Sequence, residues 1–367
     1  MSLASSADPV NRRILAVAED QVQGFHPLPF DVIASRCGLE VETVLQRLRA
    51  MLAAGVVRRV RQTLLSTHLA EGALVAWQLP EERLELAWSW LCRHDPFTGH
   101  VVLRRSERAD TPGADFRLWT TLKVPTGCGS VEEHCRLLQP VLGARAFIPL
   151  PVVGMFALGV GHVRRAGLLP GARLPEAPVM QVPTHPRLTK EEWRVLLALK
   201  ESLRPEELQR DPWSGRARQL GMAPDRFLQV ARVLDEKRVI GRFAAFLDHT
   251  RPADARTGVG ASGLFHWAFP PGEEERAGAE CGRHICMTHC YWRKGGEAFG
   301  GAQIMGVVHA ATREKVLEHK AAIDEHLAEA GLHLLHTAVF WSEKAEIRPS
   351  EINPEIYARW RRDFPAH

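Results

Sequence analysis

The stretch Thr288-His-Cys-Tyr-Trp-Arg293 is followed, after a glycine-rich turn, by Gln303-Ile-Met-Gly-Val-Val-His309. Aromatic and β-branched residues on both sides of such a turn predict a β-hairpin. Because side chains alternate between the faces of a strand, His289 and Arg293 share one face of the first strand, and His309 lies on one face of the second. We expect these groups to converge on a surface that can bind carboxylates, transfer a proton or ligate a metal.

A second copy of this pattern stands earlier in the chain, as Gly99-His-Val-Val-Leu-Arg104 followed by Arg117-Leu-Trp-Thr-Thr-Leu-Lys123. His100 matches His289, Arg104 matches Arg293, and Lys123 stands where the later copy has His309. Two amphipathic hairpins that each carry a chance histidine are the alternative interpretation. The recurrence of the His-x-x-x-Arg spacing favours a duplicated site.

The composition is that of an ordinary globular protein: 367 residues, 45% hydrophobic and 25% charged. This length predicts roughly two to four domains. The sequence shows no apolar run of membrane-spanning length and no signal peptide at its start, so we predict a soluble, cytoplasmic protein without a membrane partner. A net charge of +4 is too small to indicate nucleic-acid binding, and seven cysteines in such a chain argue against a disulfide framework.

The whole chain reads as a tandem repeat. Each copy begins with a helix-turn-helix pattern and a wing strand, and continues with the order strand, helix, two strands, helix, strand, which is ferredoxin-like. A Gly/Pro-rich stretch joins the copies. The predicted fold class is therefore α+β, a tandem of winged helix-turn-helix and ferredoxin-like βαββαβ domains. The predicted boundaries are 1–67 and 189–258 for the winged helices, 68–165 and 259–347 for the ferredoxin-like domains, 166–188 for a linker, and 348–367 for a C-terminal tail.

Matched residues support this alignment of the copies. Trp77 aligns with Trp267, and in the wing strands Arg59 aligns with Arg242. A duplicated chain can pair its halves about a pseudo-two-fold axis, as the subunits of a dimer do. We therefore expect a pseudo-dimer within one chain, which leaves further homodimerisation open.

Winged helix plus βαββαβ is the layout of the Lrp/AsnC regulators, and the sequence looks most similar to a divergent branch, the sirohaem decarboxylases of the fused two-subunit type. The most specific matches are Val239–His249, Trp267-x-x-Pro270, His289-Cys-Tyr-x-Arg293 and the strand that ends in His309. The resemblance covers nearly the whole chain. The first half departs from it, because it lacks the aromatic residue after His100 and the strand-end histidine.

The resemblance implies removal of the two acetate carboxylates of sirohaem, at positions 12 and 18, to give 12,18-didecarboxysirohaem in d-type or alternative haem biosynthesis. Carboxylates need fixed cations, and the carbon that loses CO2 must be protonated, for which His is suited near neutral pH. We predict no cofactor beyond the iron-tetrapyrrole substrate and no metal of the protein's own, with the substrate iron ligated by His289, His309 or His249. The candidate catalytic residues are His289 and His100, and the candidate substrate-binding residues are Arg293, Arg104, Arg242, Arg59, Tyr291, His309, His249 and Trp267.

Three alternatives remain. The Cys281–Cys290 region is rich in Cys and His, but its spacing matches no standard zinc pattern. An Lrp/AsnC-like, tetrapyrrole-binding transcription regulator would explain the winged helices. Neither predicted recognition helix, Val41–Ala54 or Ala223–Lys237, has a strongly basic face, so we do not expect DNA binding. A non-catalytic partner of another decarboxylase is the third alternative, and other haem-biosynthesis enzymes are candidate partners.

Overall fold

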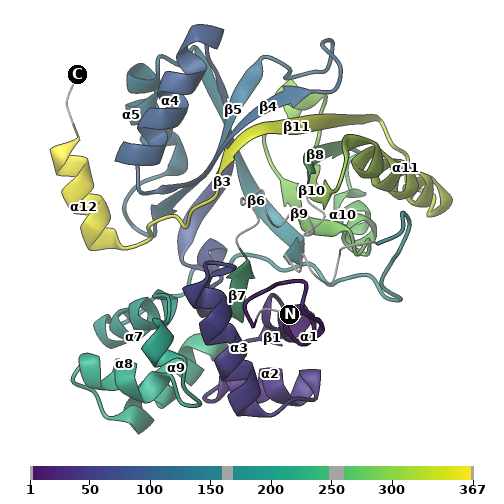
Figure 1. Ribbon diagram of the computed structural model, residues 1–367. Helices are drawn as coiled ribbons and strands as arrows, with labels where there is room; N and C mark the ends of the chain where they lie inside the picture. The colour runs from purple at the N-terminus through teal and green to yellow at the C-terminus, as the bar shows by residue number, and fades with distance from the viewer. Residues whose placement is uncertain (1–2, 159–167, 248–259, 365–367) are drawn as a thin grey trace. The chain divides into compact units, whose positions relative to one another are not determined.

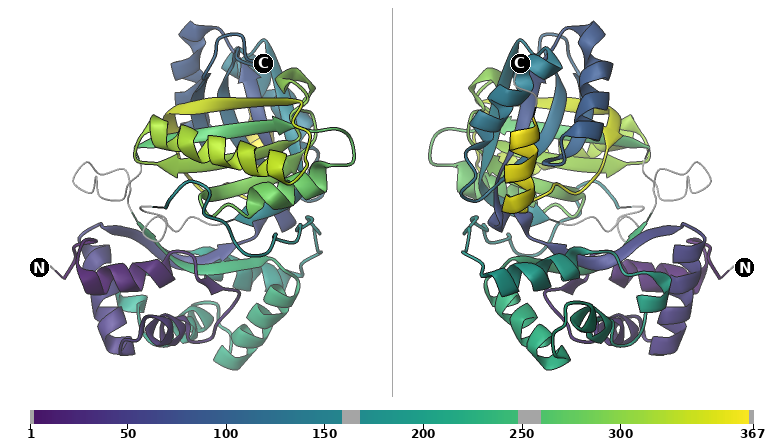
Figure 2. Two further views of the ribbon diagram at one scale, coloured as in Figure 1. Left: turned by 90° about the vertical axis from the view of Figure 1, so that its right-hand side faces the viewer. Right: turned by 90° about the vertical axis from the view of Figure 1, so that its left-hand side faces the viewer.

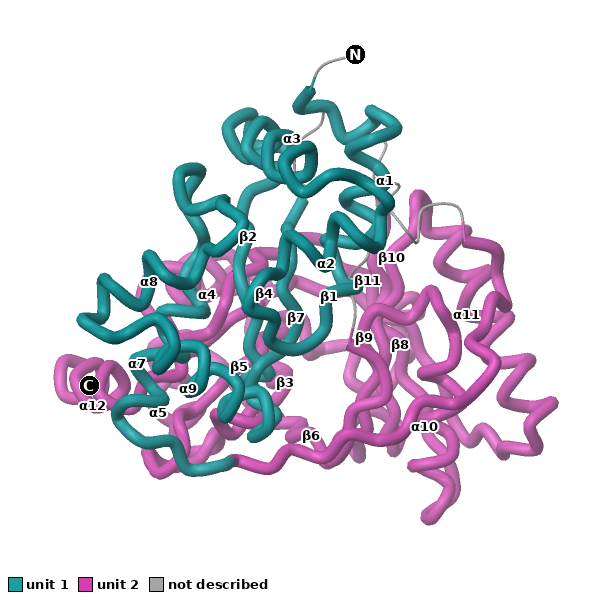
Figure 3. Tube along the Cα trace, turned by 90° about the horizontal axis from the view of Figure 1, so that it is seen from below, with its two compact units in different colours: residues 1–66, 160–166, 186–259 teal, residues 67–159, 167–185, 260–367 magenta. Residues whose placement is uncertain are grey.

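The computed structural model describes residues 3–158, 168–247 and 260–364 (Figure 1). The chain divides into two compact units, shown in different colours in Figure 3. The first unit holds residues 1–66, 160–166 and 186–259, and the second holds residues 67–159, 167–185 and 260–367. In the described ranges, no helix is both long enough and apolar enough to span a membrane.

The first unit contains two sets of three helices and one small sheet. Apolar residues at helical spacing form the core of each set, as Val44, Leu45 and Leu48 do in α3. Gly38, in the left-handed conformation with a φ of 62°, ends α2 and allows the tight turn into α3. The helices are α1 (Pro9–Ala18), α2 (Pro29–Cys37), α3 (Val41–Ala53), α7 (Lys190–Lys200), η2 (Pro205–Glu207), α8 (Trp213–Gln219) and α9 (Pro224–Glu236).

The sheet of the first unit joins the two copies of the repeat. Its order is β1 (Val22–Gln23), β7 (Ile240–Leu247), β2 (Val57–Leu64), with β2 and β7 antiparallel. These two strands are the wing strands predicted for the two copies. Each one finds its hydrogen-bond partner in the other copy, a pairing that the sequence pattern did not predict.

The second unit is built on a closed antiparallel barrel in the order β10-β8-β11-β4-β5-β3-β6-β9. The run β4-β5-β3-β6 comes from the first copy and is called the first half-barrel, and β9-β10-β8-β11 is the second half-barrel. Corresponding strands follow the same order in both. The strands are β3 (Ala70–Gln78), β4 (Thr98–Ser106), β5 (Phe116–Pro125), β6 (Ala146–Leu158), β8 (Ala261–Ala268), β9 (Met287–Arg293), β10 (Ile304–Ala310) and β11 (His336–Glu346).

Helices cover the outside of each half-barrel, as the two views of Figure 2 show. In the first half-barrel α4 (Glu81–His94) contacts β4 and β5, and α5 (Val131–Leu142) contacts β3, β5 and β6. In the second, α10 (Glu274–Gly282) and α11 (Arg313–Glu329) contact β10. A capping box of Ser130 and Glu133 fixes the start of α5. The short helices η1 (Ser66–His68) and η4 (Glu297–Phe299) lie in connections.

Two outer cores and one interior core follow from the alternation of side chains along the strands. Trp77 is fully buried beneath the helices of the first half-barrel, and Trp267 beneath those of the second. The interior core draws residues from both half-barrels, among them Trp119, Met305 and Phe340. Membership of this interior core identifies which face of each strand points into the barrel.

The helix α12 (Pro354–Asp363) forms within the stretch predicted as a C-terminal tail. Tyr357 packs into the core of the first half-barrel, with its ring 4.7 Å from that of Phe97. Its hydroxyl lies 3.1 Å from Nδ1 of His134. The predicted α+β class is confirmed.

Candidate functional site

The hairpin predicted between Thr288 and His309 is present, as β9 and β10. Met305 lies opposite Tyr291, and Val307 lies opposite His289. Met305 belongs to the interior core and Val307 packs against it. His289, Tyr291 and Arg293 therefore occupy the strand face that points into the barrel, as the alternation of the strand requires.

The earlier hairpin, β4 and β5, has the corresponding geometry. Val102 lies opposite Trp119, and both belong to the interior core, so His100 and Arg104 are on the inward face. The backbone N–H of His100 donates to Thr121 Oγ1 at 2.8 Å. The register shifts between Thr98 and Val101, and the later hairpin has its shift at the corresponding place. Such bulges re-aim neighbouring side chains, and here one stands beside each histidine.

The strand order places the two hairpins on opposite walls. β4 and β9 are four strands apart around the eight-stranded ring, and because all neighbours are antiparallel, they run in the same direction. Arg104 and Arg293 therefore face each other from opposite walls toward one end of the barrel. His100 and His289 stand on the same two strands, nearer the other end.

Both arginines are buried, each with 7% of its surface exposed. Nη1 of Arg104 donates to Ser342 Oγ at 2.8 Å, and Nη1 of Arg293 donates to the Leu150 carbonyl at 2.8 Å. Within the described ranges, the Nε of each has no hydrogen-bond partner and neither forms an ion pair with a carboxylate. Burial lowers the pKa of each guanidinium to about 10, which leaves it charged at neutral pH. Buried charges of one sign without a counter-ion indicate a site for an anionic ligand.

Tyr291 links His289 to Arg293 along β9. The Arg293 guanidinium carbon lies 4.5 Å from the centre of the Tyr291 ring, a cation–π contact. The His289 and Tyr291 rings are 6.1 Å apart and nearly parallel, at 15°. Burial raises the pKa of the Tyr291 hydroxyl, although Arg293 acts in the opposite direction. The first half-barrel has Val102 at the position of Tyr291, so this aromatic link exists in one half only.

The other predicted residues are dispersed. His309 lies on the inward face of β10, opposite Ser262. Arg59 and Arg242 belong to the first unit, where Nε of Arg242 donates to the Glu19 carbonyl at 3.0 Å. His249 lies outside the described residues.

Trp267 does not join the interior set. It points to the opposite face of β8, into the outer core, and its Nε1 donates to Asp324 Oδ1 at 2.7 Å. The Lys320 ammonium lies 5.0 Å from the centre of its ring. Its position is that of a core residue, because the barrel wall separates its side chain from the arginines.

Sequence reasoning missed His266, the residue before Trp267. It is fully buried on the inward face of β8, with its ring centre 4.7 Å from that of Phe340 and 5.8 Å from that of Trp119. Burial, with the positive charges of Arg104, His336 and Arg293, lowers its pKa to about 3, so the ring is neutral near neutral pH. Alternation along the strand places His266 on the same face as Leu264, and this was the signal in the sequence. The match of Trp267 with Trp77 favoured the neighbouring residue instead.

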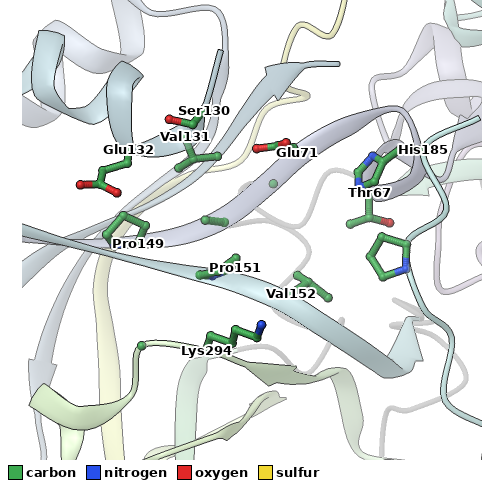
Figure 4. A pocket seen from close by; sticks show the side chains of 14 residues that line it. Thr67, Glu71, Ser130, Val131, Glu132, Pro149, Pro151, Val152, His185 and Lys294 are labelled. Atoms are coloured by element: carbon green, nitrogen blue, oxygen red, sulfur yellow. The ribbon is translucent and has the colours of Figure 1, made fainter. Parts of the chain in front are cut away.

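A separate pocket of about 550 Å³ lies against β3 and β6, beside the start of α5 and the turn that follows β9 (Figure 4). It contains none of the predicted site residues, although Lys294 directly follows Arg293 in the chain. His185 adopts a φ of 46°, unusual for a residue with a side chain. The lining residues are Thr67, Glu71, Gly72, Ala73, Ser130, Val131, Glu132, Pro149, Pro151, Val152, Pro183, His185, Lys294 and Gly295.

The cysteines near His289 take part in packing. Cys281, Cys286 and Cys290 are buried in the outer core of the second half-barrel, and Cys290 Sγ donates to the Gly278 carbonyl at 3.7 Å. Over the described ranges, no three His, Cys, Asp or Glu side chains are grouped so that they could hold a metal ion. Cys290 and His289 occupy opposite faces of β9, as the alternation of the strand predicts.

Two curated proteins are similar to this chain over most of its length. A siroheme decarboxylase of Hydrogenobacter thermophilus is 27% identical in an alignment of 311 residues that covers 80% of this chain and 85% of that protein. The siroheme decarboxylase NirDL subunit of Paracoccus pantotrophus is 23% identical over 291 residues, which are 79% of this chain and 82% of that protein. No protein-family model matches the chain.

Solved structures share the fold. The crystal structure of the siroheme decarboxylase NirDL aligns with a TM-score of 0.66 at 21% identity, over 95% of this chain and 96% of that one. A second structure of NirDL, in a co-complex with an iron-uroporphyrin III analogue, aligns with a TM-score of 0.67 at 22% identity, over 97% and 98%. The resemblance to the fused sirohaem decarboxylases that the sequence motifs predict is confirmed by these relatives, and the chain has the NirDL fold.

Proposed function

We propose that this chain is a sirohaem decarboxylase, a carboxy-lyase that removes the two acetate carboxylates of sirohaem to give 12,18-didecarboxysirohaem. Two kinds of support converge on this proposal. Curated relatives that cover most of the chain are siroheme decarboxylases, and one NirDL structure holds an iron-uroporphyrin III analogue. The product would serve d-type or alternative haem biosynthesis.

The observation that carries the proposal is the pair of buried arginines. Arg104 and Arg293 stand at matched positions on opposite walls, and within the described residues neither has a carboxylate to balance its charge. A polycarboxylate macrocycle would supply the missing negative charge. Guanidinium groups suit this role because they stay charged and can bind a carboxylate through two parallel N–H donors.

The residues then have distinct roles in the reaction. The C–C bond of an acetate breaks, CO2 leaves, and the electron pair passes into the conjugated macrocycle of the substrate. A proton delivered to the same carbon turns it into a methyl group. His289 and His100 are the proposed proton donors, since each stands on the same strand face as an anchoring arginine. The proposal needs no cofactor beyond the iron-tetrapyrrole substrate, whose iron would be ligated by His289 or His309, or by His249.

The finer architecture is also part of the proposal. Each copy would consist of a winged helix-turn-helix, at 1–67 and 189–258, and a ferredoxin-like domain, at 68–165 and 259–347, with the boundaries expected from the sequence. The strand order β4-β5-β3-β6, repeated as β9-β10-β8-β11, supports the ferredoxin-like interpretation. The two copies would act together as a pseudo-dimer.

Anaerobic incubation of the purified protein with sirohaem, followed by mass analysis of the extracted tetrapyrrole, tests the function directly. Loss of two CO2 units is the expected result. Loss of one CO2 would restrict catalysis to a single half. An unchanged mass with a shifted absorption spectrum would contradict the decarboxylase and restore the tetrapyrrole-binding regulator, which the named relatives do not favour.

A further inference from the structure

The barrel interior contains a polar group that the sequence motifs leave unassigned. We infer that His266 joins Arg104 and Arg293 to form a single carboxylate-binding site at the centre of the barrel, which holds one side-chain carboxylate of the bound tetrapyrrole. This inference rests on the proposed function for the identity of the ligand. Strand register, unpartnered polar atoms and charge define the site itself.

The register places His266 midway between the two arginines. β8 is two strands from β9 in one direction and two strands from β4 in the other. The cross-strand row beside Arg293 runs from Trp292 through Ile304 to Trp267, and the row beside Arg104 runs from Arg105 through Trp341 to Gly263. His266 lies on β8 between the ends of these rows. It therefore stands halfway around the wall between the two arginines, and both guanidiniums lie close enough to lower its pKa.

Several polar atoms around His266 have no hydrogen-bond partner among the described residues. Both ring nitrogens of His266 and the Nε atoms of both arginines are buried without a hydrogen-bond partner there. Buried polar groups normally have a hydrogen-bond partner, so several unpartnered nitrogens near one another indicate a missing ligand. A neutral imidazole can donate one N–H, and each arginine one Nε–H. A carboxylate, with two oxygens that accept several hydrogen bonds, fits such a set of donors.

The electrostatics favour an anion over a neutral ligand. Both guanidiniums lie close enough to depress the pKa of His266, and no carboxylate acts in the opposite direction. An anion at the centre would therefore be stabilised by both charges in a poorly hydrated interior. The rings of Trp119, Phe299 and Phe340 pack around His266, with ring centres 5.8, 5.5 and 4.7 Å from its own.

The two half-barrels predict one such site rather than two. Leu264 lies opposite Phe340 and His266 opposite Ala338 on β11, while on β3 the position matched to His266 is Ala76, opposite Ile148. Ala76 has no donor to offer. The arginines are duplicated, but the imidazole between them is single, so the ligand is held in one orientation.

Binding of a tetrapyrrole with and without carboxylates tests the site. The dissociation constant of iron uroporphyrin III, and of its octamethyl ester in the same mild detergent, is measured by absorbance titration for the wild type, His266→Phe and His266→Gln. We expect His266→Phe to weaken binding of the acid by roughly tenfold or more and to leave binding of the ester unchanged. His266→Gln, which keeps an N–H donor, should restore most of the affinity.

A matched control separates the site from general packing. His284 is also a buried histidine whose pKa burial lowers to about 3, but it lies outside the barrel interior, hydrogen-bonded to His326 at 2.8 Å. His284→Phe should leave both dissociation constants unchanged. If His266→Phe weakens the acid and the ester equally, or weakens neither, the carboxylate site is wrong.

Two further outcomes identify the source of the carboxylate and keep the two proposals apart. If sodium acetate stabilises the wild type against heat in a His266-dependent way while His266→Phe binds iron uroporphyrin III normally, the site takes a free small carboxylate, and the tetrapyrrole assignment is overturned. If the wild type shows the expected contrast between acid and ester but removes no CO2 from sirohaem, the proposed function fails and the carboxylate site stands.

Discussion

The two half-barrels share their anchoring positions and differ in their imidazoles. Arg104 and Arg293, and His100 and His289, occupy corresponding places beside corresponding register shifts. Elsewhere the second half-barrel carries a histidine or a tyrosine where the first has a smaller or different residue. The pairs, with the first half-barrel named first, are Ala76 and His266, Val102 and Tyr291, Lys123 and His309, and Ala146 and His336.

The difference concerns two requirements of the ligand site, fixed positive charge and groups that can transfer a proton, which are distributed differently between the half-barrels. Fixed positive charge is duplicated, so that both walls can act on one carboxylate at the centre of the barrel. Tyr291 and most of the inward imidazole groups lie in the second half-barrel, which suits chemistry that depends on protonation state. Substitutions in either set of groups test this contrast.

Replacement of the proposed proton donors should have the largest effect. His289→Ala and His100→Ala should each slow one of the two decarboxylations by about 10²- to 10⁴-fold, because a positioned general acid contributes rates of this order. A time course of tetrapyrrole masses would show a singly decarboxylated intermediate accumulating in each variant, with a different acetate retained. His94→Ala, at the exposed end of α4, is the control. Full activity in both variants would show that His289 and His100 are not the proton donors.

Replacement of the anchoring arginines should weaken binding without harming the fold. Arg104→Met and Arg293→Met should each raise the dissociation constant for iron uroporphyrin III by roughly 10- to 100-fold, the loss of a charge-assisted hydrogen bond. The apo protein should keep or gain stability, because a buried charge without a counter-ion is removed. Absorbance titration and thermal unfolding measure the two effects.

The neighbouring residue provides the matched control for this experiment. Arg105→Met removes an exposed guanidinium that pairs with Glu343 at 2.8 Å. It should change ligand affinity by no more than about twofold. Equal losses in Arg105→Met and Arg104→Met would mean that overall charge, rather than the interior position, governs binding.

The pH dependence of stability should expose the histidine that the first half-barrel lacks. The pKa of His266 is lowered to about 3 in the folded protein, while an unfolded histidine has a pKa of about 6.5. The unfolded chain therefore binds more protons below pH about 6.5, and this contribution to stability is present above that pH and is lost as the pH falls toward 3. His266→Phe should reduce the slope of unfolding free energy against pH by up to about 1.4 kcal/mol per pH unit.

Urea unfolding at several pH values below neutrality measures this slope. Ala76→Ser, at the matched position of the first half-barrel, introduces no titrating group and should leave the slope at its wild-type value. A His266→Phe variant with the wild-type slope would show that the ring protonates as easily in the folded protein as in the unfolded chain.

The pocket of Figure 4 should contribute least to binding of iron uroporphyrin III. Lys294 is the lysine among its lining residues and follows Arg293 in the sequence, but it lies outside the interior set. Lys294→Gln should weaken binding of iron uroporphyrin III by about twofold, and added salt should abolish the difference, as for a surface charge. A loss comparable to that of Arg293→Met would make the pocket, rather than the barrel interior, the principal site.

Local patterns predicted the elements of this fold well. α5 begins at a capping box, and the β9–β10 hairpin pairs as expected, because period, turn and cap signals are local. Closure of the barrel and the pairing of β2 with β7 depend on contacts between distant strands, which periodicity does not encode. His266 was missed for the same reason. Its relation to Arg104 and Arg293 exists only once the strand order is known.

The exchange of strands between the copies also has a consequence for how the chain is made. β2 pairs with β7, β6 with β9, and β4 with β11, so three strands of the first copy complete their hydrogen bonds only with strands of the second. During synthesis the first copy leaves the ribosome with these edges open, and open edges invite pairing with other chains. We expect folding to be slow and late, with the nascent first half the stage most prone to aggregation and most dependent on chaperones.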